Sequence, residues 1–116
     1  MMMMMMMMMM MMCLLQRLTV LDASDNEINV LPEKFVELKW LRVARFSRNH
    51  IVDISPLVGL TGCEELDLSE NEITEIPDSI SRMTSLVTLD LSRNGIKDIP
   101  TGVCKVQRLC LLRLNL

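Results

Sequence analysis

The stretch that decides the fold is LDLSENEITEIP at residues 66–77, because LDLSRNGIKDIP at residues 89–100 repeats it with few changes. Both copies open on Leu-Asp-Leu-Ser, carry an asparagine five residues after the first leucine and end on Ile-Pro. A phrase that recurs at a fixed interval is the sequence signature of a repeat architecture. The asparagine is therefore the natural point on which to align the rest of the chain.

The asparagine recurs in four copies, at intervals of 23, 22 and 23 residues, as Asn26, Asn49, Asn71 and Asn94. In each copy an apolar residue stands eight, five and three positions before it and two and five positions after it. These five columns are Leu18, Leu41, Cys63 and Leu86; Leu21, Ala44, Leu66 and Leu89; Ala23, Phe46, Leu68 and Leu91; Ile28, Ile51, Ile73 and Ile96; and Leu31, Ile54, Ile76 and Ile99. A fifth copy starts at Leu109 and stops before its asparagine. The chain therefore holds about four complete repeats and a truncated fifth.

This pattern resembles the leucine-rich repeat, LxxLxLxxNxL, and the resemblance covers essentially all of residues 15–116. The tails LPEKF, IPDSI and IPTGV are similar to those of intracellular repeat proteins of the Ras-signalling and scaffold type. The second copy, with ISPLVGL, resembles the 22-residue class of phosphatase-regulating and ciliary proteins. The resemblance implies an α/β fold: a right-handed solenoid with a short parallel β-sheet on its concave face and short helical or extended convex segments. It also implies protein binding, with no active site of its own.

The physical chemistry of the repeat supports the same architecture. Leu66 and Leu68 alternate with Asp67, so the two leucines lie on one face of a short strand. One repeat cannot bury that face alone, and stacked neighbours produce a parallel sheet over a continuous apolar core. The recurring asparagine amide is expected to bond the backbone of its own turn and of a neighbouring one, which makes a structural ladder. Two further core columns are predicted on the convex side: Leu15, Leu38, Leu60, Met83 and Val106, and Phe35, Val58, Ile80 and Val103.

The two ends of the chain differ from the repeats between them. Residues 1–12 are all Met and form a low-complexity or artefactual segment, so residues 13–116 are the repeat region. Twelve apolar residues are too few to cross a bilayer, and no membrane span is expected. Repeat arrays need polar capping units, and neither end has the pattern of one. We therefore expect a segment of a longer array, or a chain whose ends are covered in a large complex.

Two columns of charged residues are predicted on the exposed side of the strands. The central column is Asp22, Arg45, Asp67, Asp90 and Arg113, and the outer column is Asp25, Arg48, Glu70, Arg93 and Leu116. The outer column alternates in sign, so it is either a solvated ladder of ion pairs or part of a binding face. Asp67 and Asp90 are neighbouring like charges that a basic partner would relieve, although Asp is also common at this family position. Arg45 is either a partner anchor or the counter-ion of Asp22 and Asp67.

The single tryptophan, Trp40, lies one residue before a repeat start. The other copies hold Arg17, Gly62, Ser85 and Arg108 at this position, so the register predicts an exposed edge. Trp40 is either an interface residue or folded over apolar neighbours on the convex surface. The serine column, Ser24, Ser47, Ser69 and Ser92, is expected to support its loop. The candidate partner-binding residues are Trp40, Arg45, Arg48, Asp67, Glu70, Asp90, Arg93 and Arg113.

Composition argues against several other kinds of site. The net charge is −3, the basic residues are scattered and aromatic residues are few, so direct nucleic-acid readout is not expected. His50 is the one histidine, without a second ligand or a nucleophile, so neither a metal site nor a catalytic site is predicted. The glycines are isolated, and no phosphate-binding loop or cofactor is expected. The four cysteines form no CxxC pair and indicate a reducing intracellular compartment, either the cytoplasm or a cilium- or cytoskeleton-associated one.

The predicted function is a protein-protein interaction module or scaffold that binds a partner through the concave face. One alternative is the regulatory repeat region of a larger signalling enzyme, such as a kinase, phosphatase or ubiquitin ligase. Another is a structural subunit of a large assembly, such as a ciliary or ribonucleoprotein complex. No constellation of catalytic groups supports an enzyme within these residues, so none is predicted.

Overall fold

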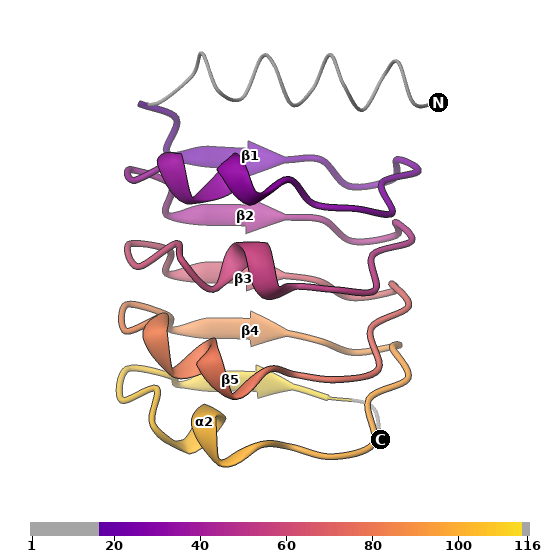
Figure 1. Cartoon of the computed structure of the whole chain (residues 1–116), viewed down its shortest axis with the longest axis vertical. Coiled ribbons are helices and arrows are strands. Elements are labelled where there is room, and N and C mark those ends of the chain that lie inside the picture. Colours follow the sequence, from indigo (N-terminus) through magenta and orange to yellow (C-terminus); the bar gives the residue numbers. More distant parts are fainter. Residues whose placement is uncertain (1–16, 115–116) are drawn as a thin grey trace.

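The computed structural model describes residues 17–114 of the 116-residue chain. Five strands of three residues each form one parallel sheet, in which the order of the strands is their order in the chain (Figure 1). The strands are β1 (Val20–Asp22), β2 (Val43–Arg45), β3 (Glu65–Asp67), β4 (Thr88–Asp90) and β5 (Leu111–Arg113). Leu15 and Leu116, which belong to two of the predicted columns, lie outside the described residues.

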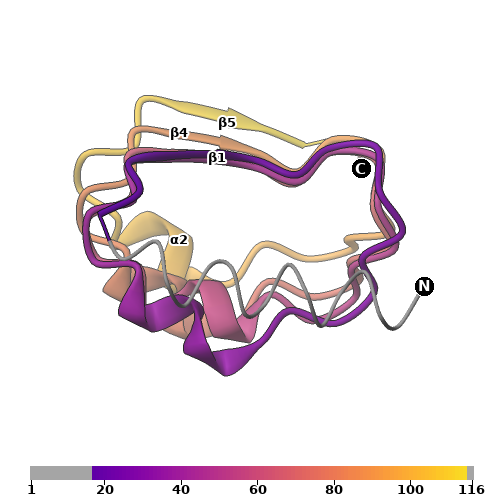
Figure 2. The same cartoon turned by 90° about the horizontal axis from the view of Figure 1, so that it is seen from above.

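Short helical segments run along the side opposite the sheet, one in each connection between strands (Figure 2). They are η1 (Glu33–Glu37), η2 (Ser55–Leu57), η3 (Asp78–Arg82) and α2 (Thr101–Cys104). Pro32, Pro77 and Pro100 stand directly before three of these segments, with extended backbone angles. Proline has no N–H to give to a sheet and its ring fixes φ, so it ends an extended segment and begins a helical one. The chain is thus a leucine-rich-repeat solenoid, and the predicted fold class is confirmed.

The register of the sheet follows the columns of the sequence. Leu66 pairs with Ala44 on one side and with Leu89 on the other, and these residues are buried. Their neighbours on the opposite face of the strands are only half-buried. Because side chains alternate along a strand, the aligned leucines cover the core while the aligned charges face outward.

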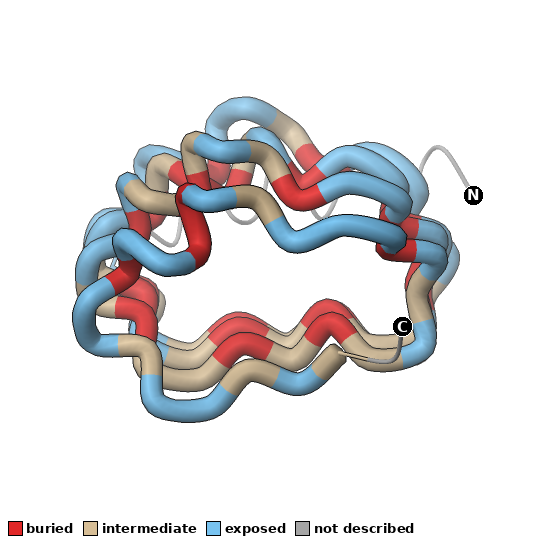
Figure 3. Tube along the Cα trace, turned by 90° about the horizontal axis from the view of Figure 1, so that it is seen from below, coloured by how far each residue is buried: buried red, intermediate tan, exposed pale blue. Residues whose placement is uncertain are grey.

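The core lies between the sheet and the helical segments. Figure 3 shows the buried positions on the sides of these two layers that face each other. Phe46 and Phe35 meet there edge to face, with ring centroids 5.7 Å apart. Ala44, two residues before Phe46, is also fully buried. Ile99 differs from the rest of its column, because its side chain is 45% exposed whereas Leu31, Ile54 and Ile76 are buried.

The 22-residue copy changes one of the predicted core columns. In η1 the Phe35 carbonyl accepts a hydrogen bond from the Leu38 N–H at 3.0 Å. In η2 the Leu57 carbonyl accepts the corresponding bond from the Leu60 N–H at 3.0 Å. Leu57, and not Val58, is therefore the counterpart of Phe35. The prediction placed Val58 in this column because it counted from the asparagine without allowing for the missing residue. Val58 is nevertheless buried beside it.

The asparagines tie neighbouring repeats together. The Asn49 Oδ1 accepts a hydrogen bond from the Ile28 N–H at 3.1 Å, and its Nδ2 donates to the carbonyls of Ala23 at 3.1 Å and Phe46 at 2.9 Å. The same arrangement recurs at Asn71 and Asn94. Each of these amides therefore satisfies backbone groups of its own turn and of the preceding one.

The cysteines should differ sharply in reactivity. Cys63 is buried, whereas Cys104 and Cys110 are exposed free thiols. Burial raises the pKa of the Cys63 thiol to about 12, so at mildly alkaline pH this thiol stays protonated as well as shielded. We expect iodoacetamide to alkylate Cys104 and Cys110 in the folded protein and to leave Cys63 unmodified, as measured by peptide mapping. Unfolding in guanidinium should make Cys63 as reactive as the other two, and equal labelling of Cys63 in the folded protein would contradict this assignment.

Candidate protein-binding face

The outward side of the sheet carries the charged columns in register. Asp22 lies opposite Arg45, which in turn lies opposite Asp67, and the column continues through Asp90 to Arg113. Strands in a sheet are spaced by about 4.8 Å, so side chains in one column are direct neighbours. The central column predicted from the sequence is therefore a continuous row across five strands.

The aspartates of this row also support the loops that follow the strands. The Asp67 Oδ1 accepts hydrogen bonds from the Ser69 N–H at 3.0 Å and the Ser69 hydroxyl at 2.7 Å. Asp90 and Ser92 repeat the arrangement at the same distances. Sequence reasoning missed this role, although an Asp two residues before a Ser is a recognised turn signal. These bonds engage one oxygen of each carboxylate.

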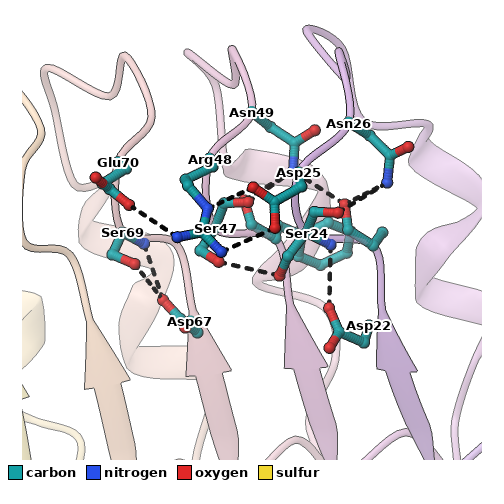
Figure 4. A network of polar contacts seen from close by, with 12 residues as sticks. Asp22, Ser24, Asp25, Asn26, Ser47, Arg48, Asn49, Asp67, Ser69 and Glu70 are labelled. Atoms are coloured by element: carbon teal, nitrogen blue, oxygen red, sulfur yellow. Dashed lines mark hydrogen bonds and ion pairs between the residues drawn. The ribbon is translucent and has the colours of Figure 1, made fainter.

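Asp22 shows the effect of the same turn on a carboxylate. Its Oδ1 accepts a hydrogen bond from the Ser24 N–H at 3.1 Å (Figure 4). The bonds from Ser24 to the charged carboxylate, and more weakly the positive charge of Arg45, lower the pKa of Asp22 below its ordinary value. The loop is thus supported by the ionised form of the aspartate.

Arg45 forms an ion pair, but not with either of the two carboxylates named from the sequence. Its Nη2 lies 3.0 Å from the Glu65 Oε2, whereas one of the two expectations was a pair with Asp22 and Asp67. Glu65 lies diagonally across on β3, since the direct neighbour of Arg45 is Asp67. The long glutamate side chain reaches the guanidinium, while the Asp67 carboxylate is already held by its serine. Ser47, which has no aspartate two residues before it, instead donates its hydroxyl to the Ser24 hydroxyl at 3.0 Å.

The outer column is an ion-pair ladder along one edge of the face (Figure 4). Arg48 forms two contacts with the Asp25 carboxylate, of which the Nη2–Oδ2 contact is 2.8 Å, and its Nη1 lies 3.9 Å from the Glu70 Oε2. The Arg93 Nη1 lies 3.3 Å from the Glu70 Oε1. The hydrogen bond to Asp25 is the largest cause that raises the pKa of Arg48. Asp25, Arg48 and Arg93 are exposed and Glu70 is half-buried, so the ladder contributes little to stability and presents alternating charge to water.

The backbone of this ladder is unusual. Asp25, Arg48, Glu70 and Arg93 all have positive φ angles, between 54° and 58°, although none is glycine. This left-handed conformation costs a residue with a Cβ on the order of 1 kcal/mol. It turns the chain out of each strand just before the ladder asparagine. Sequence reasoning missed it, and the only available signal was the fixed position before the asparagine.

The like-charged pair of the central column stands apart from these paired groups. Asp67 on β3 lies directly opposite Asp90 on β4, and within residues 17–114 neither forms an ion pair. Arg113 is the neighbour of Asp90 on β5 and is exposed. Two ionised carboxylates side by side on adjacent strands repel each other, so a cation placed between them is favoured.

The remaining singled-out residues lie away from this pair. Trp40 is 62% exposed in the turn between η1 and β2, so of its two interpretations the structure favours the exposed edge over burial on the convex surface. His50 follows a ladder asparagine, and its Nδ1 lies 2.8 Å from the exposed Glu72 carboxylate. Among residues 17–114 there is no group of three or more His, Cys, Asp or Glu side chains placed to hold a metal ion. The helices in this region are also too short to cross a membrane.

Comparison with known proteins agrees with this geometry. Residues 45–96 match the leucine rich repeat family. The chain has the leucine-rich-repeat fold. These repeats are 32% identical over 83 residues to leucine-rich repeat serine/threonine-protein kinase 1 of Mus musculus, a match that covers 63% of this chain and 4% of the kinase.

Solved leucine-rich-repeat structures superpose closely on the chain. A leucine-rich-repeat protein of Leptospira interrogans has a TM-score of 0.86 at 28% identity, covering 90% of this chain and 27% of that protein. Internalin C2 of Listeria monocytogenes has a TM-score of 0.78 at 25% identity, covering 89% and 46% of the two chains. The chain thus spans less than half the length of each of these three proteins. Leucine-rich repeats are stacked units whose exposed surfaces generally serve protein binding.

Proposed function

We propose that these repeats form a protein-interaction module that binds its partner through the outward face of the sheet. The observation that carries this proposal is the pair of Asp67 and Asp90, aligned on adjacent strands without an ion pair in the described part of the chain. The partner places a lysine or arginine side chain over this pair. The flanking Arg45 and Arg113 then meet acidic or polar groups of the same partner.

The geometry of the pair suits a guanidinium or ammonium group. The Oδ1 atoms of Asp67 and Asp90 are held by Ser69 and Ser92, which fixes the orientation of both carboxylates before a partner arrives. Groups that are already ordered lose less entropy on binding, and charge-assisted hydrogen bonds are the stronger ones. A basic side chain also removes the repulsion between the two aspartates. The face therefore favours partners with a basic contact residue.

Removing the two charges should weaken binding without changing the fold. Asp67→Asn combined with Asp90→Asn keeps an oxygen that can accept the bonds from Ser69 and Ser92 but abolishes both negative charges. We expect peptides selected on the full chain from a displayed random library to be enriched in Arg and Lys, and to bind this variant at least about tenfold more weakly. Fluorescence anisotropy of the selected peptides measures the affinities.

The matched control is Asp53→Asn combined with Asp98→Asn. Asp53 holds the Ser55 N–H at 2.9 Å in the same kind of turn, but it lies in the connection leading to η2 and not on the sheet. The control changes the net charge by the same amount and should bind like the parent chain. Selected peptides without basic enrichment, or equal weakening by the two double variants, would count against the proposed face.

A second candidate function is the regulatory repeat region of a larger signalling enzyme. Its support is the 32% identity to the mouse kinase, of which the match covers a small part. The LPxxI-type tails support the intracellular Ras-group and scaffold class of repeat. The free thiols of Cys63, Cys104 and Cys110 support a reducing compartment. Sequencing the full reading frame separates the two candidates, because only the second requires a catalytic domain in the same chain.

A further inference from the structure

A second exposed surface carries positively charged side chains and lies at the edge of the sheet where the chain enters the strands. It consists of Arg17, Lys39, Trp40 and Arg42, which we call the tryptophan edge. All four are exposed, and Trp40 and Arg17 hold the same position in successive repeats, 23 residues apart. Arg42 belongs to the same turn, where its N–H bonds the Thr19 carbonyl at 2.8 Å. Three exposed cations therefore lie in the same turn as Trp40 or at its position in the preceding repeat.

The cations of the tryptophan edge form no ion pair within the described part of the chain. The ion pairs formed by residues 17–114 involve Arg45, Arg48, His50 and Arg93, and none involves Arg17, Lys39 or Arg42. On the sheet face, by contrast, Arg45, Arg48 and Arg93 form cross-strand ion pairs. The three cations of the tryptophan edge outnumber the exposed carboxylates that border them, Glu37 and Glu64, so the edge is locally positive in a chain of net charge −3. Such a region attracts a negatively charged group by charge complementarity.

The next repeat has no side chain at the position that corresponds to Trp40. The position that follows Trp40 in this column is Gly62, and a Cβ built there would lie 3.2 Å from the Lys39 carbonyl and 3.9 Å from that of Leu41. The backbone of Gly62 thus packs directly against the backbone on both sides of Trp40, yet no side chain extends there. Along its column Trp40 has Arg17 one repeat before it and Gly62 one repeat after it. The exposed indole offers an apolar contact, and the neighbouring cations attract anions.

The extent of the surface limits what it can hold. Beyond Arg42 its column continues with Glu64 and Val87, so the positive region ends after two repeats. Two repeats correspond to about 5–10 Å, which is roughly three residues of extended chain. A nucleic-acid backbone or a membrane needs a longer row of cations than this. A short acidic peptide with one apolar residue fits both the length and the chemistry.

We propose that the tryptophan edge docks a short acidic segment of a partner protein, with an apolar side chain on Trp40 beside Gly62 and carboxylates on Arg17, Lys39 and Arg42. This surface is separate from the sheet face, which is expected to take basic groups. It does not depend on the function proposed for that face. A partner can therefore be gripped by both surfaces, or two partners can be bound at once.

The experiment uses the single tryptophan as its own probe. The full chain is titrated with the peptide Asp-Glu-Phe-Glu-Asp, blocked at both ends, while the emission of Trp40 is recorded. We expect a saturable change in emission that weakens as salt is added. The charge-reversed peptide Lys-Arg-Phe-Arg-Lys should produce none. An absent response to the acidic peptide, or an equal response to both peptides, overturns the proposal.

Variants separate local contacts from general charge effects. Replacing the three cations by glutamine, as Arg17→Gln, Lys39→Gln and Arg42→Gln, should weaken binding of the acidic peptide at least about tenfold. The control Arg82→Gln, Lys97→Gln and Lys105→Gln removes the same charge from exposed positions elsewhere and should leave binding unchanged. Equal losses in the two triple variants overturn the site. Circular dichroism verifies that both variants are folded.

Two further probes test the class of ligand. Vesicles of phosphatidylserine and a single-stranded oligonucleotide are titrated under the same conditions. The proposal expects both to bind more weakly than the acidic peptide, because the cations span only two repeats. If either binds more tightly and is lost in the Arg17, Lys39 and Arg42 variant, the edge is a phosphate-binding surface and the protein-segment proposal is wrong.

Discussion

Asn49→Ala is expected to lower the free energy of unfolding by about 3 kcal/mol, because it leaves one buried backbone N–H without an acceptor and removes two further hydrogen bonds. The Ile28 N–H loses its acceptor. The carbonyls of Ala23 and Phe46 each lose one donor and keep a second, from the amides of Asn26 and Asn71. Asn49 is itself buried at 5% exposure, so water does not easily replace these bonds. Guanidinium unfolding followed by circular dichroism measures the loss.

Asn26→Ala is the matched control for this prediction. The Asn26 Nδ2 bonds the carbonyls of Ala23 at 2.8 Å and Ser24 at 3.1 Å, both in its own turn, and its side chain is only part-buried. Its removal should cost clearly less than that of Asn49. Equal losses at the two positions would mean that the amide serves its own turn alone and that the link to the preceding repeat is energetically unimportant.

Gly102→Ala is expected to destabilise the protein by about 3 kcal/mol or more, because a buried side chain has no space there. A Cβ at Gly102 would lie 2.2 Å from the backbone carbonyl oxygen of Asp78. Gly102 lies in α2 and Asp78 opens η3, so relief of the clash requires two neighbouring repeats to separate. A backbone atom cannot rotate away as a side chain could. Thermal and guanidinium unfolding should both show the loss.

Gly95→Ala tests whether the loss of stability expected for Gly102→Ala comes from replacing any glycine or from the close approach to the neighbouring backbone. A Cβ at Gly95 would meet the Thr74 Cγ2 at 3.6 Å and the Ile73 carbonyl at 3.8 Å, which are ordinary contacts. This variant should be neutral or stabilised by about 0.5 kcal/mol, since alanine restricts the unfolded chain. A Gly102→Ala protein as stable as Gly95→Ala would show that α2 and η3 can move apart at little cost.

The fold could be predicted from the sequence because each repeat restates the same constraints. Leu66, Leu89 and Ala44 align in the sheet as they align in the sequence, and the asparagine fixes the register. The misassignment of Val58 occurred where the interval falls to 22 residues, since a count along the chain cannot show on which side of the turn the residue is missing. The close approach at Gly102 was invisible too, because Lys34 and Ser79 fill the same position in other repeats.

The positions of the charged residues could be predicted from the sequence, but their ion-pair partners could not. The central column follows from strand alternation, and the structure places its members in register. The outer column lies in the turns after the strands, where ion pairs join its members. Which charges meet depends on side-chain length and on competing hydrogen bonds. Arg45 pairs with the longer Glu65 side chain, while the Oδ1 of Asp67 accepts bonds from Ser69, and neither fact is set by the spacing of residues. The positive φ of Arg48 and its counterparts is likewise a property of the turn and not of the residue type.

The order of the strands in the sheet is their order in the chain, and this has a mechanical consequence. Each strand is bonded only to the strands one repeat before and after it. A pulling force applied at the two ends is therefore carried in series through successive junctions, and the weakest junction yields first. Tension would peel the coil apart repeat by repeat, without any strand having to slide past another, so the module can lengthen in steps under load.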